Sequence, residues 1–192
     1  MELNGERTIS ASVPDTWAAL NDPETLKACV AGCESLERVG DDAFAAVVAM
    51  RIGPVSARFK GNLKLSNVQP PTSYTINFDG QGGVAGFGKG SADVSLAAID
   101  PITTRLAYRA RATVGGKMAQ IGSRLIDAAA AKITDDFFAA FEAQLLARAP
   151  AGVRAAAAAS APAPRVREPA GTLGWVLAAL VVLATSAIIV WH

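Results

Sequence analysis

Residues 55–65 read VSARFKGNLKL, and apolar and polar side chains alternate along almost all of this stretch. The odd-numbered positions from Val55 to Leu65 are apolar or glycine, whereas the even-numbered positions are serine, asparagine, lysine or arginine. Successive side chains of a β-strand point to opposite faces, so a period of two separates an apolar face from a polar one. The stretch therefore predicts a strand of an antiparallel sheet that has one face against a core and one in water.

The same alternation recurs on both sides of this strand. It is found over residues 44–52, 74–78, 92–98 and 106–114, and Leu3, Arg7 and Ile9 share one register in a further strand near the N-terminus. The short connections at 52–54 and 69–71 contain glycine or proline and are typical of turns between neighbouring strands. We expect one strand, two short helices, six further strands and one long helix, in that order.

Proline and apolar periodicity predict the helices. Pro14 suits the first turn of a helix that ends at Leu20, and a second short helix begins after Asp22. Residues 117–146 repeat apolar side chains at three- and four-residue spacing, which is typical of a long amphipathic helix. The apolar stripe consists of Met118, Ile121, Leu125, Ala129, Ile133, Phe137, Phe141 and Leu145. Such a helix must bury its stripe on the apolar face of the sheet, which predicts an α+β fold.

Small side chains dominate the expected contact between the long helix and the sheet. They include Ala110 and Ala112 on the sheet and Gly122 and Ala129 on the helix. Because protein cores are close-packed, either the helix lies closer to the sheet than usual or a ligand fills the space. The residues alone leave these two alternatives open.

The composition indicates that part of the chain is not in water. Of 192 residues, 51% are hydrophobic and 18% are charged, and the mean hydropathy is +0.29. Residues 171–191 carry no charge, and as a helix they would span about 30 Å, the thickness of one hydrocarbon core. Trp175 and Trp191 would mark its two interfaces. We interpret the segment as a single-pass transmembrane anchor; the alternative is a buried core helix.

The residues that precede this segment predict its orientation in the membrane and the boundary between the folded domain and a linker. Arginines stand before the segment, at positions 154, 165 and 167, and no basic residue follows it, so the preceding domain should face the cytoplasm. Residues 150–170 are rich in alanine, proline and arginine and read as a linker. We therefore expect a folded domain over 1–149, a linker over 150–170 and an anchor in the cytoplasmic membrane over 171–191.

Several classes of site are excluded by residue counts. A net charge of +1 gives no electrostatic basis for binding nucleic acid. The single histidine is His192, so histidine base catalysis and most metal sites are excluded from the fold. Cys29 and Cys33 are too few for a metal site or a disulfide framework, although a redox pairing between them stays open.

Residues 80–90 contain six glycines and match two phosphate-binding patterns. Both patterns require a helix directly after the loop, and an alternating strand follows instead, which argues against a nucleotide site. The remaining alternatives are a hairpin loop without function and a loop that acts as a lid or contacts a partner. The residues assigned to this lid or partner loop are Gly83, Gly86, Phe87, Gly88 and Lys89.

Four stretches together resemble the CoxG-like family of CO dehydrogenase subunits, within the START/SRPBCC helix-grip superfamily. They are DPETLKACVAGCESLE (22–37), IGPVSARFKG (52–61), GGVAGFGKGSA (82–92) and VGGKMAQIGSRLID (114–127). The resemblance implies a seven-stranded antiparallel sheet that grips a long C-terminal helix around a hydrophobic cavity. It also implies a partner, a molybdenum hydroxylase of the CO dehydrogenase type that is recruited to the cytoplasmic membrane.

We expect the cavity to bind a hydrophobic small molecule, such as a respiratory quinone. Its predicted lining is Arg7, Phe59, Phe78, Tyr108, Ala110, Ala112, Gly122, Leu125 and Ala129. Arg7 has the inward register of its strand and can donate to a quinone carbonyl or a carboxylate. Alternatively, the strand bulges near Gly5 and turns Arg7 outward. Tyr108 also has an inward register, and its alternative role is that of an ordinary core aromatic.

The function predicted from these observations is that of a membrane-anchored accessory protein. It would recruit the hydroxylase, contact membrane lipid and carry a quinone, with no covalently bound cofactor and no metal. No enzymatic activity is expected, because no histidine is available and no carboxylate has an inward register. The alternative is a purely structural anchor or assembly factor for the dehydrogenase that binds no ligand.

Overall fold

The computed structural model describes residues 2–148, and the predicted linker and anchor lie outside them. The elements follow in the order β1 (Glu2–Ile9), α1 (Val13–Leu20), α2 (Pro23–Cys29), β2 (Cys33–Gly40), β3 (Ala43–Ile52), β4 (Val55–Gln69), β5 (Ser73–Gln81), η1 (Gly83–Ala85), β6 (Phe87–Asp100), β7 (Thr103–Gly115), α3 (Lys117–Gln120) and α4 (Ser123–Arg148). This order confirms the predicted succession of strands and helices.

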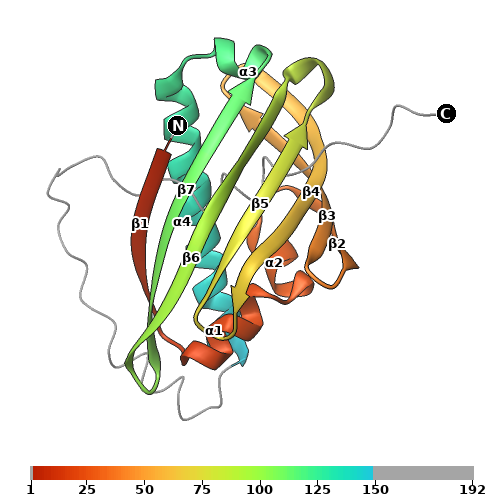
Figure 1. The fold of residues 1–192 in the computed structure, drawn as a ribbon. Helices are drawn as coiled ribbons and strands as arrows, with labels where there is room; N and C mark the ends of the chain where they lie inside the picture. Colours follow the sequence, from red (N-terminus) through yellow and green to blue (C-terminus); the bar gives the residue numbers. More distant parts are fainter. Residues whose placement is uncertain (1, 149–192) are drawn as a thin grey trace, which may run out of the picture.

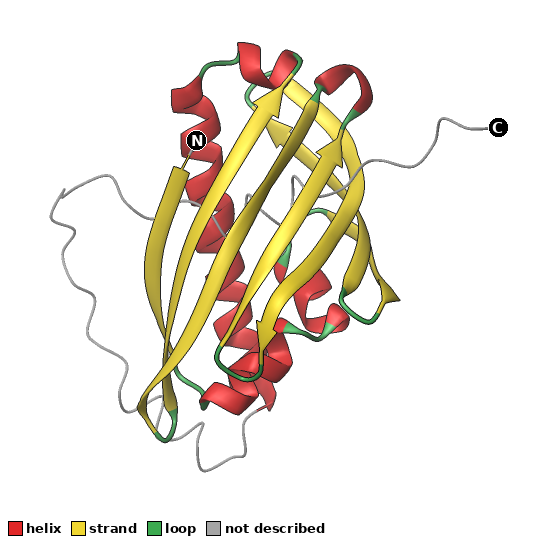
Figure 2. Ribbon diagram, in the orientation of Figure 1, coloured by secondary structure: helices red, strands yellow, loops and turns green. Residues whose placement is uncertain are grey.

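The strands form one seven-stranded sheet in the order β1-β7-β6-β5-β4-β3-β2, and every neighbouring pair is antiparallel. The sheet is strongly twisted, and α4 runs along its inner face while α1 and α2 close one end (Figure 1). The opposite face of the sheet carries no helix of the described chain (Figure 2). The predicted α+β helix-grip arrangement is therefore confirmed for the described residues.

The alternation within the strands divides inner from outer face as predicted. In β4, Phe59 and Leu63 are buried against the core, whereas Arg58 and Lys60 are exposed on the outer face. The short helices also begin at the expected residues. Ser12 caps α1 by accepting from the Asp15 amide, and Asp22 caps α2.

The long helix differs from the prediction in its first two turns. Gly122 has a φ of +90° and separates the short α3 from α4. Leu125 is 51% exposed, so its predicted place on a buried stripe is wrong. The reason is geometric: each four-residue step turns about 40° beyond a full turn, so the spacing from Leu145 back to Leu125 accumulates about 200°. The face of α4 that packs inward instead contains Ala130, Thr134, Phe137, Phe138, Phe141 and Leu145.

The core has two parts. The larger cluster lies between the sheet, α1, α2 and the second half of α4. A smaller cluster of Ile52, Phe59, Ala85 and Met118 lies beneath η1 and α3. No helix within residues 2–148 combines the length and apolar character that a membrane crossing needs.

Candidate ligand cavity

An apolar cavity lies inside the larger core cluster, between the inner face of the sheet and helices α1, α2 and α4. Its lining consists of Leu20, Leu26, Leu36, Phe44, Leu63, Leu65, Tyr74, Ile76, Val94, Leu106 and Phe137. The volume of the cavity is ≈ 50 Å³. Ligand pockets usually hold about 300–1,000 Å³, so a ring-bearing ligand requires the walls to move apart.

Tyr74 supplies the one polar side chain that the described residues contribute to this lining. It lies on β5, where the alternation that buries Phe78 also turns Tyr74 inward. Its ring and that of Trp17 form a T-shaped pair, with centroids 5.3 Å apart and an interplanar angle of 81°. Burial raises the pKa of the Tyr74 phenol above its ordinary value, so the hydroxyl stays protonated and can donate to a ligand.

The wall opposite the sheet is held by an electrostatic contact at the start of α2, where Asp22 caps the helix. Asp22 Oδ2 accepts from Thr25 Oγ1 and, at 2.8 Å, from Arg148 Nη2. These two bonds, in that order of weight, lower the pKa of Asp22 to about 2. α2 carries Leu26 of the lining, so the Asp22 carboxylate ties this wall to the last turn of α4.

The nine residues predicted to line a ligand cavity lie elsewhere. Phe78, Tyr108, Ala110 and Ala112 are buried in the larger cluster but are not part of the cavity lining. Phe59 belongs to the smaller cluster, and Ala129 packs against it. Gly122 and Leu125 are exposed where α3 meets α4. The structure therefore moves the candidate cavity toward α1 and α2.

Arg7 has the predicted inward register, because β1 pairs with β7 without a shift at Gly5. The alternative of a bulge at this point is wrong. The guanidinium nevertheless finds its partners within the fold: it lies 5.3 Å from the ring centroid of Phe138 and 2.5 Å from Asp135 Oδ1. Tyr108 is buried and stacks on the same Phe138 ring, with the two ring centroids 6.2 Å apart.

The glycine-rich loop forms η1 and the start of β6. Gly83 and Gly86 both have positive φ, Gly88 is buried, and Phe87 and Lys89 are exposed. A side chain at Gly86 would collide with the backbone of Gly115, so the loop packs directly on the β7–α3 turn. The geometry leaves both surface roles, lid and partner contact, as proposals.

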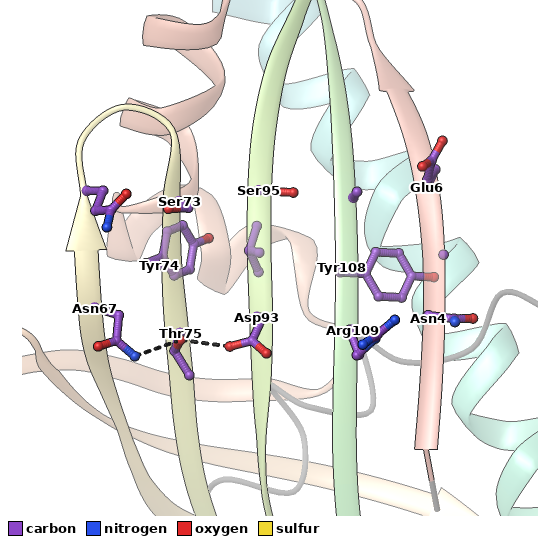
Figure 3. Close-up of a pocket in the computed structure, with 14 residues that line it drawn as sticks. Asn4, Glu6, Asn67, Ser73, Tyr74, Thr75, Asp93, Ser95, Tyr108 and Arg109 are labelled. Carbon is purple, nitrogen blue, oxygen red and sulfur yellow. Dashed lines mark hydrogen bonds between the residues drawn. The ribbon is translucent and has the colours of Figure 1, made fainter.

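A second hollow lies on the outer face of the sheet and was not predicted (Figure 3). It is an open polar groove of ≈ 710 Å³ across β1, β7, β6, β5 and β4. Asn67 donates to Thr75 at 3.3 Å, and Thr75 donates to Asp93 at 2.7 Å, with Arg109 opposite Asp93 on β7. Asn67 has a φ of +52° and lies at an irregularity of the β4–β5 pairing. The alternation of side chains in sequence did not predict this irregularity.

The cysteines and carboxylates of the described chain do not form a reactive or metal-binding group. Burial raises the pKa of the Cys29 thiol to about 11 and also raises that of Cys33. Both cysteines are free, and Cys33 Sγ donates to the Ser35 carbonyl at 3.4 Å. Residues 2–148 contain no cluster of three or more histidine, cysteine or acidic side chains placed to hold a metal ion.

Comparison with known proteins places this fold in context. Residues 5–146 match the model of the CoxG family, which is described as a subunit of carbon monoxide dehydrogenase. A conserved protein from Geobacillus kaustophilus is 31% identical over 76% of this chain and 95% of its own, with a TM-score of 0.72. No curated protein matches the chain.

Two more distant structures share the fold alone. A START superfamily protein from Mycobacterium smegmatis is 12% identical over 75% of this chain and 96% of its own, with a TM-score of 0.60. The Zhui aromatase/cyclase from Streptomyces sp. R1128 is 12% identical over 79% of this chain and 97% of its own, with a TM-score of 0.61. The chain thus has a START-like fold.

Proposed function

Because the chain belongs to the CoxG family of carbon monoxide dehydrogenase subunits, we propose that it is an accessory protein of a molybdenum hydroxylase of that type. In this role it carries a hydrophobic ligand, a respiratory quinone, in the cavity beneath α1 and α2. The observation that carries the ligand proposal is the cavity lining, which consists of ten apolar residues and Tyr74, the one residue of the lining with a hydroxyl.

A quinone matches this lining chemically. Its ring and isoprenoid tail are apolar, and its carbonyl oxygens accept hydrogen bonds, so Tyr74 can orient the ring while the other side chains exclude water. The cavity must expand before a ring can enter. The wall formed by α1 and α2 is the part best suited to move, because these helices have seven or eight residues each and carry no strand pairing.

The lining favours binding over catalysis. Tyr74 is its one titratable side chain within residues 2–148, and it is held neutral by burial. General acid–base chemistry needs a group whose pKa lies near the working pH, and no carboxylate, lysine or histidine of the described chain lines the cavity. We therefore assign the protein a carrier role and not an enzymatic one.

The membrane location rests on the uncharged residues 171–191, which lie outside the described part of the chain. In this proposal they hold the protein in the cytoplasmic membrane with the folded domain in the cytoplasm. The hydroxylase then binds an exposed surface of the domain and is kept next to the quinone pool. The polar groove across the outer face of the sheet supplies such a surface.

A titration with a short-chain quinone tests the ligand proposal. Val94 lines the cavity, so Val94→Phe should fill it and abolish binding. Val48 is buried in the same cluster but does not line the cavity. Val48→Phe should therefore lower stability by about 1–3 kcal/mol while binding persists in the folded fraction. Equal binding by the parent and Val94→Phe would rule out this cavity.

The second candidate function is an anchor or assembly factor that binds no ligand. The observation that favours it is the small volume of the cavity, ≈ 50 Å³. Removing the whole protein from cells should release the hydroxylase from membranes under either function. Absence of quinone binding by the parent, together with that release, would leave only this second function.

A further inference from the structure

Exposed apolar side chains gather at the end of the domain that is farthest from α1 and α2. We call this end, formed by the β3–β4 turn, η1, the start of β6, α3 and the start of α4, the glycine end (top of Figure 1). Val84 is 84% exposed, Phe87 41% and Leu125 51%. Each therefore leaves much of its apolar surface in water, which marks an interaction site when such residues share one end.

The glycine end presents these side chains on a closely packed base. Gly86 and Gly116 bring the backbones of η1 and the β7–α3 turn together, and a side chain on either would collide with the other segment. The Phe87 ring lies over Gly115, where any Cβ would meet it. Met118 and Ala85 are buried directly beneath. The exposed residues therefore project from packed structure.

Basic side chains surround the apolar ones. Arg51, Lys89, Lys117 and Arg124 are all exposed at this end, and none forms an ion pair with another residue of the described chain. Arg111 on the neighbouring strand is instead paired with Glu2. Among the carboxylates near these bases, Asp127 lies three residues after Arg124, Asp93 lies four residues after Lys89, and Asp79 lines one surface hollow together with Lys89. The glycine end is thus apolar at its tips and predominantly positive around them.

Three other exposed apolar side chains lie next to acidic residues instead. Ile99 and Ile102 flank Asp100 in the β6–β7 turn, and Val39 precedes Asp41 and Asp42. Exposed apolar area alone therefore does not distinguish the glycine end. The combination of exposed apolar area with positive charge does distinguish it. This combination matches the surface of a bilayer, where anionic headgroups cover apolar acyl chains.

We propose that the glycine end docks on the surface of a bilayer that contains anionic lipid. Val84, Phe87 and Leu125 enter the interface between headgroups and acyl chains, and the four basic side chains contact the lipid phosphates. This contact is separate from the anchor at 171–191 and does not depend on a ligand or on the hydroxylase. With this contact, the domain stands with its glycine end on the membrane and with α1 and α2 directed toward the cytoplasm.

The place where the described chain ends is compatible with this orientation. α4 has 26 residues and is therefore about 39 Å long, so Arg148 lies about that far from the glycine end. Residues 149–170 extend to at most about 75 Å. This segment, which we call the tether, is thus long enough to reach the same membrane that the glycine end contacts.

Vesicle sedimentation tests the docking proposal with the chain truncated after Arg148, because both core clusters lie entirely within residues 2–148. The vesicles contain phosphatidylcholine with or without one third phosphatidylglycerol. We expect binding to the anionic vesicles, weak binding to neutral ones, and release at high salt. Val84→Asp combined with Phe87→Asp should weaken binding more than tenfold, whereas Ile99→Asp combined with Ile102→Asp should change it less than twofold.

A charge-matched pair isolates the basic contribution. Lys117→Glu with Arg124→Glu should reduce binding more than tenfold, since each basic residue near an anionic surface contributes about fivefold. Lys27→Glu with Arg105→Glu makes the same change in net charge away from the glycine end and should have little effect. Melting curves confirm that all four variants are folded.

Three results would overturn the docking proposal. The first is a parent domain that does not bind anionic vesicles, and the second is an equal loss in glycine-end and control variants. In the third, glycine-end variants lose capture of the hydroxylase but keep vesicle binding, which would make this end a protein interface. Quinone titration of the same variants separates this outcome from the proposed function, because docking variants should bind quinone normally.

Discussion

Arg148 Nη2 lies 2.8 Å from Asp22 Oδ2, so the last residue of α4 is joined to the residue that caps α2. The same carboxylate accepts from the amides of Glu24 and Thr25 at 3.3 Å. The Asp22 side chain therefore caps α2 and also holds α2, which forms a wall of the cavity, against the last residue of α4. Its ionisation links pH to the stability of that wall.

Acid should weaken this contact in a defined pH range. The pKa of Asp22 is about 2 in the fold against 3.8 ordinarily, so its stabilising effect is complete above about pH 4 and is lost as pH falls toward 2. Asp22→Asn keeps a capping side chain but loses the charge, so its stability deficit relative to the parent should shrink over that range. Asp22→Ala should lose about 1 kcal/mol more at pH 7. Urea unfolding at pH 7, 4 and 2.5 measures both, and a deficit for Asp22→Asn that stays constant would contradict the assignment.

The two buried tyrosines should differ in their effect on quinone affinity. Tyr74→Phe removes the one hydroxyl of the cavity and should weaken binding about three- to tenfold, the range expected for one neutral hydrogen bond. Tyr108→Phe is the matched control, because Tyr108 is equally buried but stacks on Phe138 outside the cavity. Titration of both variants with a short-chain quinone gives the comparison. An effect confined to Tyr108→Phe would restore the cavity position expected from the sequence.

Two glycines of the same loop should respond differently to alanine. A Cβ at Gly86 would collide with the Gly115 carbonyl, whereas a Cβ at Gly83 meets nothing within 4 Å. Both have positive φ, so Gly83→Ala should cost about 1 kcal/mol from backbone strain alone. Gly86→Ala should cost clearly more, because backbone must also shift. Thermal and urea unfolding check the order, and equal costs would mean that η1 is not packed against the β7–α3 turn.

Truncation after Arg148 tests the proposed anchor. The truncated protein should leave the membrane fraction in a high-salt wash, since the remaining contact through the glycine end needs the attraction of its basic side chains to anionic lipid, which salt screens. The full chain should stay in the membrane fraction under the same wash and enter solution only with detergent. A truncated protein that resists the wash would show that residues 171–191 are not what holds the chain.

The strands and short helices were predictable because their signals are local. A period of two needs only neighbouring residues, and the capping residues Ser12 and Asp22 act on the turn beside them. The break at Gly122 was missed, since a four-residue repeat looks continuous in sequence although it rotates around the helix. Glycine at that position was the available signal.

The position of the cavity depends on contacts between elements and was not predictable from register. Tyr74 pairs with Val94, and Val94 pairs with Tyr108, so the three lie in one row across β5, β6 and β7 with the same inward direction. The position of α4 decides between the tyrosines: Phe138 covers Tyr108, and Tyr74 is left beside the open space. The strand register predicts that both tyrosines point inward, but it does not predict which of them α4 covers.

Mass spectrometry of lipids extracted from the purified full chain tests the central claim most directly. The account predicts a quinone that copurifies with the parent at close to one per chain and is absent from Val94→Phe prepared in the same way. Val48→Phe, which leaves the cavity lining intact, should retain it. A parent without bound quinone, or a Val94→Phe variant that retains as much as the parent, would contradict the claim that this cavity carries the ligand.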